Sequence, residues 1–508
     1  MARVSAVAKR RGALQRQALA SGVSNRPLAA LAGALLTVAI AVLLLTITTA
    51  REDVIFGPDA SVRLLAFEFI AASLILFLAS TSARMHLALQ MVMIYLTIYL
   101  ILPGYHHGSN NTFPFYGMHY PEDIRLRAAG LISVFIISLM IGYMIGDQSQ
   151  RMGRAPKLIG REIIFPNKVL LIAFTVAAVA ATGVFLATVG FGGAFGLRGE
   201  TGGGGGSKAA VGLLVTLPRI VTFVSFAYCY ILFLRARKAG IALYFLLLNT
   251  PFFFVTNFPL ALARFALFGI VLFFVVQTYN LRGAMARTVL TVAFVFGALF
   301  AMPYVDSLTR HVSEGSAGSL QQSYTSYLES GDFDGLQSIQ NAIIYHDSKG
   351  TTNGRQIISA ALFFVPRSIW SEKGEPTGAI TSKAAGFEFN NISQPLPSEF
   401  YVDFGIYGAA ALSLLLGFGI ARLDGWINRN WDAGPRARLI AGVVVAFGVI
   451  LMRGTLLGIV PPIVVFSAGV GAIITLGLRS PEKLLLRHRR RDFARPLPQT
   501  GRRAQRQS

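Results

Sequence analysis

The sequence predicts an all-α polytopic membrane protein with about twelve transmembrane helices. Of the 508 residues, 54% are hydrophobic and only 14% are charged, whereas soluble globular chains carry about 25% charged residues. Apolar runs of roughly 20 residues recur along the chain, and this is the length that a helix needs to cross a bilayer. A soluble fold is incompatible with this pattern.

The predicted helices follow the apolar runs in order. They are placed at 27–49, 64–83, 87–103, 127–146, 169–190, 211–234, 239–258, 260–279, 288–303, 400–421, 437–453 and 457–478. The stretches 239–279 and 437–478 are each interpreted as a hairpin on their length alone. The chain then divides into 1–26 (basic tail), 27–303 (helices one to nine), 304–399 (large loop), 400–478 (helices ten to twelve) and 479–508 (basic tail).

The formal charge of +22 does not indicate nucleic-acid binding, because the basic residues are not gathered on one soluble face. They lie at the ends of apolar runs instead. When the helices are threaded alternately from a cytoplasmic start, the inner segments hold about two thirds of the 46 Lys and Arg residues. Both termini are therefore predicted to be cytoplasmic, and the 304–399 loop extracytoplasmic. We expect this loop to fold into short helices on the outer membrane surface, since it is not of low complexity.

Two patterns look chemical but favour simpler interpretations. The run Gly202–Gly206 superficially resembles a phosphate-binding loop, yet it lacks the Gly-Lys-Ser/Thr order and follows no predicted strand. We interpret it as a flexible outer loop. The histidines His106, His107 and His119 have no Cys or acid at a ligand spacing. No metal site is expected.

Arginines at outer helix ends are more informative, because they oppose the positive-inside bias. Arg219, Arg264 and Arg453 lie within or beside predicted spans, and Arg367 lies in the long loop. Snorkelling explains any one of them singly. Together they indicate an outward-facing anion site, since guanidinium suits bidentate phosphate contacts.

Two carboxylates lie at the start of the tenth predicted helix. Glu399 and Asp403 are four residues apart, so we expect them to share one helix face and to point into the same outer cavity. The alternative is that both are simply placed favourably at a helix amino terminus.

Two motifs then resemble the Wzy-type oligosaccharide repeat-unit polymerases. Residues 365–378 read VPRSIWSEKGEPTG, and residues 397–408 read PSEFYVDFGIYG. The family signature Pro-Arg-x-x-Trp-Pro-x-Lys-Pro is matched by Pro366, Arg367, Trp370 and Lys373, although Ser371 and Gly374 replace its prolines. The family's Glu-Phe-Tyr-x-Asn/Asp-Phe-Gly helix entry is matched by Glu399, Phe400, Tyr401, Asp403, Phe404 and Gly405. Ala263-Arg264-Phe265 and Met452-Arg453-Gly454 are similar to the arginines of two further family helices.

The resemblance implies a metal-independent, cofactor-free inverting glycosyltransferase with a GT-C-like architecture in the bacterial plasma membrane. Its substrate would be a polyprenyl-diphosphate-linked oligosaccharide, polymerised on the outer face, with a flippase and a chain-length regulator as possible partners. We expect Arg264, Arg367 and Arg453 to bind the diphosphate, with Arg219 as a weaker addition. Glu399 is the candidate general base and Asp403 the second choice. Trp370, Lys373 and Tyr401 would contact substrate from the two motifs.

Two other functions stay open. An O-antigen ligase uses the same donor with a different acceptor. A transporter or flippase would carry internal repeats and ionisable groups near the midplane of the bilayer. The sequence shows no repeat, and its ionisable groups gather towards the outer ends of the helices.

Overall fold

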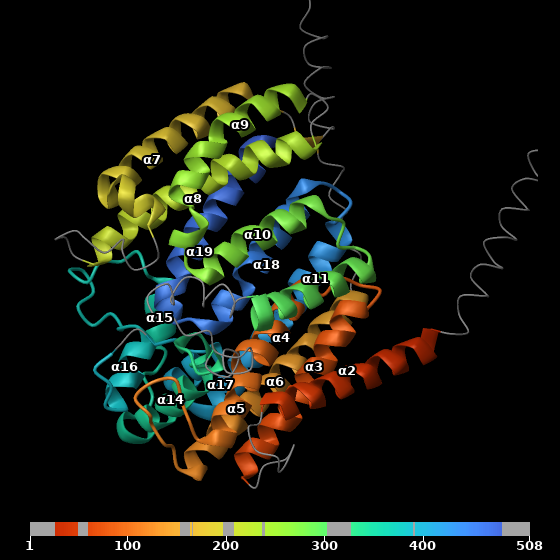
Figure 1. Ribbon diagram of the computed structural model, residues 1–508, viewed down its shortest axis with the longest axis vertical. Coiled ribbons are helices and arrows are strands. Elements are labelled where there is room, and N and C mark those ends of the chain that lie inside the picture. The colour runs from red at the N-terminus through yellow and green to blue at the C-terminus, as the bar shows by residue number, and fades with distance from the viewer. Residues whose placement is uncertain are drawn as a thin grey trace, which may run out of the picture. The chain divides into compact units, whose positions relative to one another are not determined.

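The computed structural model describes residues 26–48, 59–152, 163–164, 166–196, 208–235, 239–301, 327–389 and 392–479. Nearly all of these residues are helical (Figure 1). The described strands β1 (Ile163–Ile164) and β2 (Leu478–Arg479) form one short antiparallel pair. The all-α class is therefore confirmed. Apart from their residues nearest the helices, the two predicted basic tails lie outside the described residues, as do the 202–206 glycines and residues 304–326 and 390–391 of the predicted loop.

Each predicted span coincides with a helix. The helices are α2 (Arg26–Thr48), α3 (Ala60–Thr81), α4 (Leu87–Ile94) continued by the π-helix η1 (Tyr95–Ile101) and by α5 (Leu102–Asn110), α6 (Glu122–Met152), α7 (Lys168–Phe195), α8 (Lys208–Arg235), α9 (Ala239–Thr256), α10 (Arg264–Thr278), α11 (Ala284–Phe296), α17 (Leu396–Asn430), α18 (Pro435–Arg453) and α19 (Leu456–Ala472). Short π-helices extend α11 (η3, Gly297–Ala301) and α19 (η6, Ile473–Gly477), and the 3₁₀ turn η2 (Pro259–Ala261) precedes α10.

Eight of the described helices are long and apolar enough to cross a membrane. They are Ala60–Thr81, Leu87–Asn110, Glu122–Gln150, Lys168–Phe195, Leu214–Arg235, Leu396–Asn430, Pro435–Arg453 and Leu456–Gly477. The four other predicted spans contain shorter apolar helices, namely Leu31–Thr46, Gly240–Thr256, Phe265–Thr278 and Ala284–Phe300. The chain is a multi-pass helical membrane protein, whereas the number of twelve crossings stays a prediction.

The helices divide between two compact units. Unit 1 comprises Met1–Arg151, Asn280–Gly425 and Phe447–Pro461, and unit 2 comprises Met152–Tyr279, Trp426–Ala446 and Pro462–Ser508. The helices α17, α18 and α19 contribute residues to both units.

Small residues bring α6 and α17 into close contact in unit 1. A side chain at Gly142 would meet the backbone of Leu414, and one at Gly146 would meet the backbone of Phe418. These two glycines are four residues apart on α6, so they form one smooth stripe. Helices in membranes pack closely along such stripes because backbone contact replaces the hydrophobic driving force that lipid does not supply.

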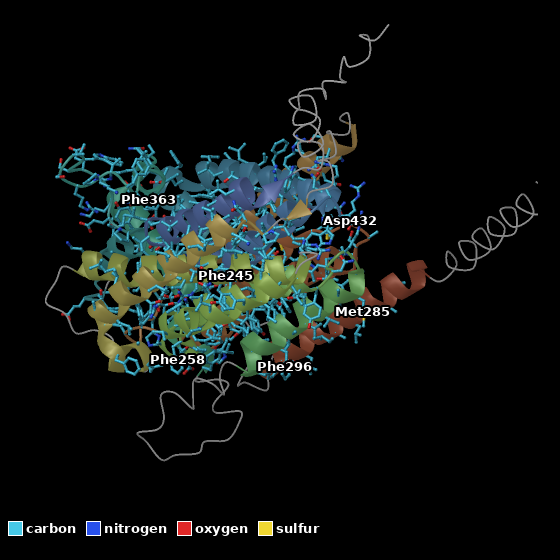
Figure 2. The ribbon with its side chains drawn as sticks, turned by 90° about the horizontal axis from the view of Figure 1, so that it is seen from above. Phe245, Phe258, Met285, Phe296, Phe363 and Asp432 are labelled. Carbon is cyan, nitrogen blue, oxygen red and sulfur yellow. The ribbon has the colours of Figure 1, made fainter. Side chains whose placement is uncertain are left out.

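Polar contacts join the helix ends of unit 1 in two separate groups. At one end, the Ser61 N–H donates to Glu122 at 2.9 Å, and Arg125 pairs with Asp59 at 3.0 Å. At the other end, Asp424 accepts the N–H of Ala88 at 2.8 Å, which belongs to the first turn of α4. Met285 and Phe296, labelled in Figure 2, lie near the two ends of α11.

Unit 2 is built around α7, α8 and α9, which lie side by side in Figure 1. Buried Asn249 of α9 joins all three helices. Its amide donates to the Thr175 hydroxyl of α7 at 2.9 Å, and its oxygen accepts the Ser225 hydroxyl of α8 at 2.7 Å. An amide that is satisfied in this way fixes the register of three otherwise apolar helices.

Short helices form between α11 and α17, within the predicted large loop. They are α14 (Gly335–Lys349), α15 (Arg355–Ala361) and α16 (Thr377–Ala384), preceded by the 3₁₀ turn η5 (Gly331–Phe333) and drawn in teal and green in Figure 1. The helix α17 begins before residue 400, at Leu396, and it is interrupted at Gly405, where φ is 67°. Glycine is favoured there because L-residues rarely adopt this conformation.

Candidate active site

The two predicted carboxylates lie on the short part of α17 that precedes the break at Gly405. Both Glu399 and Asp403 are fully buried, at 0% exposure. Burying a carboxylate is costly unless donors replace the lost water. Each of the two therefore has to be supplied with hydrogen-bond donors by the surrounding chain.

Glu399 connects α17 to α16 and to the turn between α18 and α19. The hydroxyl of Thr377, the first residue of α16, donates to Oε2 at 2.5 Å. The backbone N–H of Leu456, the first residue of α19, donates to Oε1 at 2.8 Å. Both carboxylate oxygens are thus occupied by donors from the chain.

Asp403 caps α15. Its carboxylate accepts the backbone N–H of Gln356 at 3.1 Å and that of Ile357 at 2.8 Å. The Thr352 hydroxyl also donates to Asp403. A carboxylate in this position satisfies amide groups that have no partner within the helix.

The helix face that Glu399 and Asp403 share is buried in the structure. Their spacing does place them on one helix face, but α15, α16 and the α18–α19 turn cover that face. A general base must lie within about 2.6–3.2 Å of the proton that it removes. The observed contacts show that both residues hold three neighbouring elements in place, and a role of either as a base stays a prediction.

Arg453 lies at the end of α18, in the same turn that Glu399 contacts. Its guanidinium donates to the Gly331 carbonyl at 2.9 Å and to the Asp332 carbonyl at 3.2 Å. It also pairs with the buried carboxylate of Asp334 at 3.4 Å. The structure therefore brings the predicted residues Arg453 and Glu399 together at one turn.

The first motif forms a loop closed by its own cations. The Arg367 guanidinium donates to the Lys373 carbonyl at 2.6 Å and to the Gly374 carbonyl at 2.8 Å. Lys373 Nζ donates to the carbonyls of Phe363 at 2.7 Å and Val365 at 2.9 Å.

This loop is connected to the second motif through α15. The Gly374 N–H donates to the Ser359 hydroxyl of α15 at 2.8 Å, and α15 is the helix that Asp403 caps. Trp370 is half-buried in the loop, and its backbone N–H donates to the Pro366 carbonyl at 3.1 Å. The Arg367 side chain itself is exposed.

Tyr401 is buried beside an ion pair that sequence reasoning missed. Arg127 of α6 holds both oxygens of Asp347 in α14 at 2.7 Å, and it donates to the Tyr401 hydroxyl at 3.5 Å. This arginine lowers the pKa of Asp347 below its ordinary value. The ring centroid of Tyr401 lies 4.8 Å from that of His346.

The remaining predicted arginines belong to unit 2. Arg219 donates to the Thr256 carbonyl at 3.1 Å, and its guanidinium lies 5.4 Å from the centre of the Phe185 ring. Arg264 is the first residue of α10, and its side chain lies outside what the structure describes. The structure thus groups Arg367, Lys373, Glu399, Asp403 and Arg453 in unit 1.

Sequence reasoning also missed Asp334 and its partner Ser393. The buried Asp334 carboxylate accepts the Ser393 N–H at 2.9 Å and the Ser393 hydroxyl. No motif marks either residue. Their one signal is an acidic residue directly before a helix, at Asp334-Gly335, and this pattern is common in ordinary helix caps.

Comparison of the chain with protein-family models, with curated proteins and with solved structures gives no significant match.

Replacing Arg453 with glutamine should make stability depend on pH. Burial raises the pKa of Asp334, while Arg453 and the Ser393 hydrogen bonds oppose that rise. A carboxyl group whose folded pKa is raised stabilises the protein at low pH, and this contribution is lost as pH rises through that pKa. Without Arg453 the pKa of Asp334 should rise further, and removing one partner of such a pair should cost about 3 kcal/mol at neutral pH.

The measurement is the thermal unfolding temperature in detergent at acidic and neutral pH. The Arg453→Gln variant should lose more stability than the wild type as pH rises. The double variant Asp334→Asn with Arg453→Gln is the control and should show a flatter profile. An Arg453→Gln profile parallel to that of the wild type would contradict the pairing.

Proposed function

We propose that this protein is a membrane glycosyltransferase that polymerises polyprenyl-diphosphate-linked oligosaccharide repeat units. One observation carries the proposal. The two motifs that resemble the Wzy-type polymerases are hydrogen-bonded to each other through α15 in unit 1, and Glu399 of the second motif accepts the N–H of Leu456, three residues after Arg453. The loop of Arg367 and the helix entry of Asp403 are thus joined through α15, and the helix entry is joined to the α18–α19 turn, where Arg453 lies.

The chemistry of this assembly suits a diphosphate leaving group. Negative charge develops on the diphosphate as the glycosidic bond breaks, and fixed cations stabilise the charge where it appears. Arg367 is exposed and bonded to two backbone carbonyls, and its planar guanidinium can present further N–H groups to phosphate oxygens. We assign it the leading role in diphosphate binding, with Arg453, Arg264 and Arg219 as further candidates.

We assign Glu399 and Asp403 the role of holding α15, α16 and the α18–α19 turn in place. The sequence predicts Glu399 as the base that activates the acceptor hydroxyl, with Asp403 as the second choice. Their oxygens are occupied by Thr377, Leu456 and the first turn of α15. Removing either carboxylate should therefore disturb the placement of the motifs before it affects any proton transfer.

The proposal also includes the membrane topology. Twelve crossings, cytoplasmic termini and an outer position for 304–399 in a bacterial plasma membrane would place Arg367 and Arg453 on the extracytoplasmic side. Within unit 1, helix ends that this threading assigns to the same side are in contact, as Arg125 and Asp59 are. This agreement supports helices that cross the membrane in alternating directions. It does not depend on which side is extracytoplasmic.

The decisive experiment supplies purified protein in liposomes with polyprenyl-diphosphate-linked repeat units. We expect a ladder of lipid-linked oligomers that increase by one repeat unit at a time. An O-antigen ligase would yield product only when a non-prenyl acceptor such as lipid A core is added. A transporter would leave the repeat units unchanged in length. Either of these outcomes, from protein that is folded by size-exclusion chromatography, would overturn the proposal.

A further inference from the structure

In the segment 355–374, here called the α15 segment, two cations are bonded to the segment's own backbone. The Arg367 guanidinium and Lys373 Nζ between them donate to four backbone carbonyls of the same segment. The Gly374 N–H is likewise satisfied within the segment, by Ser359. Two cations thus bond backbone carbonyls that water could bond if the loop lay in solution.

Four apolar side chains of the segment are exposed. Phe364 is 67% exposed and Ile369 is 78% exposed, and both Ile358 and Leu362 are exposed as well. Single exposed apolar residues are common on soluble proteins. Here four of them lie within twelve residues, on a loop whose two cations donate to its own backbone. A concentration of this kind marks a surface that contacts another apolar phase.

The α15 segment is fixed to the point where a membrane-spanning helix begins. Asp403 caps α15, the Val402 carbonyl accepts the Thr352 N–H at 2.9 Å, and a side chain at Gly354 would meet the Phe404 ring. Directly after the Gly405 break, Tyr407 of α17 is 89% exposed and Ile406 is exposed too. These residues start the long apolar part of a candidate span, so lipid is the phase that they meet.

We propose that the α15 segment is an interfacial membrane anchor whose outward side chains Ile358, Leu362, Phe364 and Ile369 enter the lipid of the bilayer. The segment carries the label Phe363 in Figure 2. Its exposed apolar side chains continue those of Phe404, Ile406 and Tyr407 at the entry of α17. Interfacial segments bind in this way, with apolar side chains reaching the acyl boundary and cations near the headgroups.

The anchor goes beyond the proposed function, because it concerns the lipid of the bilayer and holds whether or not the protein joins sugars. It has one functional consequence if the polymerase proposal is right. A loop held at the headgroup level would keep Arg367 at the depth where a membrane-bound diphosphate lies.

The test measures the depth of nitroxide labels in lipid nanodiscs by electron paramagnetic resonance. Cys229, the single cysteine of the chain, is buried and would be replaced by alanine. Labels would be attached to Ile369→Cys and Phe364→Cys, with Lys349→Cys as the control on an exposed position of α14. Oxygen gathers in lipid, whereas a charged nickel chelate stays in water, so the ratio of the two collision rates reports depth.

We expect the oxygen-to-nickel ratio at 364 and 369 to exceed that at 349 several-fold. Equal ratios at the three positions would show that the α15 segment lies in water and would overturn the anchor. Labels at 364 and 369 that neither reagent reaches would show that protein covers the segment, which overturns it as well. Because the readout does not involve glycan synthesis, failure of the anchor and failure of the polymerase proposal are distinguishable.

Discussion

Replacing Glu399 with alanine is expected to destabilise the protein by about 3–5 kcal/mol, whereas glutamine should leave it folded and active. Alanine leaves the Leu456 N–H and the Thr377 hydroxyl without their buried acceptor, at roughly 1–3 kcal/mol each, and it opens a cavity. Glutamine has nearly the same shape. Its carbonyl oxygen can accept from Leu456, while its amide donates to the Thr377 hydroxyl.

The measurement is thermal unfolding in detergent, followed by the rate of ladder formation at matched amounts of folded protein. The Glu399→Gln variant should keep its unfolding temperature within a few degrees and its rate within about tenfold of the wild type. Loss of a general base costs about a hundred- to ten-thousandfold in rate. A stable Glu399→Gln variant with a loss of that size would restore Glu399 as the base and remove the positioning assignment.

Replacing Arg367 with lysine is expected to slow ladder formation nearly as much as replacing it with alanine. The arginine donates to two carbonyls at once, at 2.6 and 2.8 Å, and its planar group can also reach phosphate oxygens. An ammonium group is a point charge on a flexible stem and cannot reproduce this geometry. Hydrogen bonds to charged groups contribute roughly 1.5–3 kcal/mol each, so the rate should fall by about ten- to ten-thousandfold.

The matched control is Arg355→Lys, because Arg355 is also an exposed arginine of the α15 segment. It should support ladders at close to the wild-type rate. Membrane abundance and unfolding temperature are compared for all variants, so that a general loss of folding is separated from a loss of rate. Wild-type ladders from Arg367→Lys would contradict the assignment of Arg367 to diphosphate binding, because they would show that the planar guanidinium is not needed at this position.

The architecture could be predicted from the sequence because the bilayer imposes a length and a composition on each span. The helix placed at 87–103 illustrates this, since the observed helical stretch Leu87–Asn110 covers it. The boundary of α17 was predicted less well. Its first turn, from Leu396, carries the polar residues Ser398 and Glu399. The span was predicted from its apolar run, and these residues are not part of that run.

The surroundings of the candidate site could not be predicted in the same way. The spacing of Glu399 and Asp403 determines which helix face they share, but burial depends on what packs against that face. The covering residues Thr377 and Leu456 lie 22 and 57 positions away from Glu399. No local pattern encodes such contacts. The same limit explains why the pairing of Asp334 with Arg453, across 119 positions, went unnoticed.

The break at Gly405 divides α17 into two parts that can change independently. The first part carries Glu399 and Asp403 and is held by α15, α16 and the α18–α19 turn. The second part packs against α6, where Gly417 approaches the backbone of Leu139. In a continuous helix, one inserted residue would rotate everything beyond it by about 100°. With the break in between, an insertion in the spanning part leaves both carboxylates facing their donors. The part of α17 after Gly405 can therefore differ in length, to suit membranes of different thickness, while Glu399 and Asp403 keep their contacts.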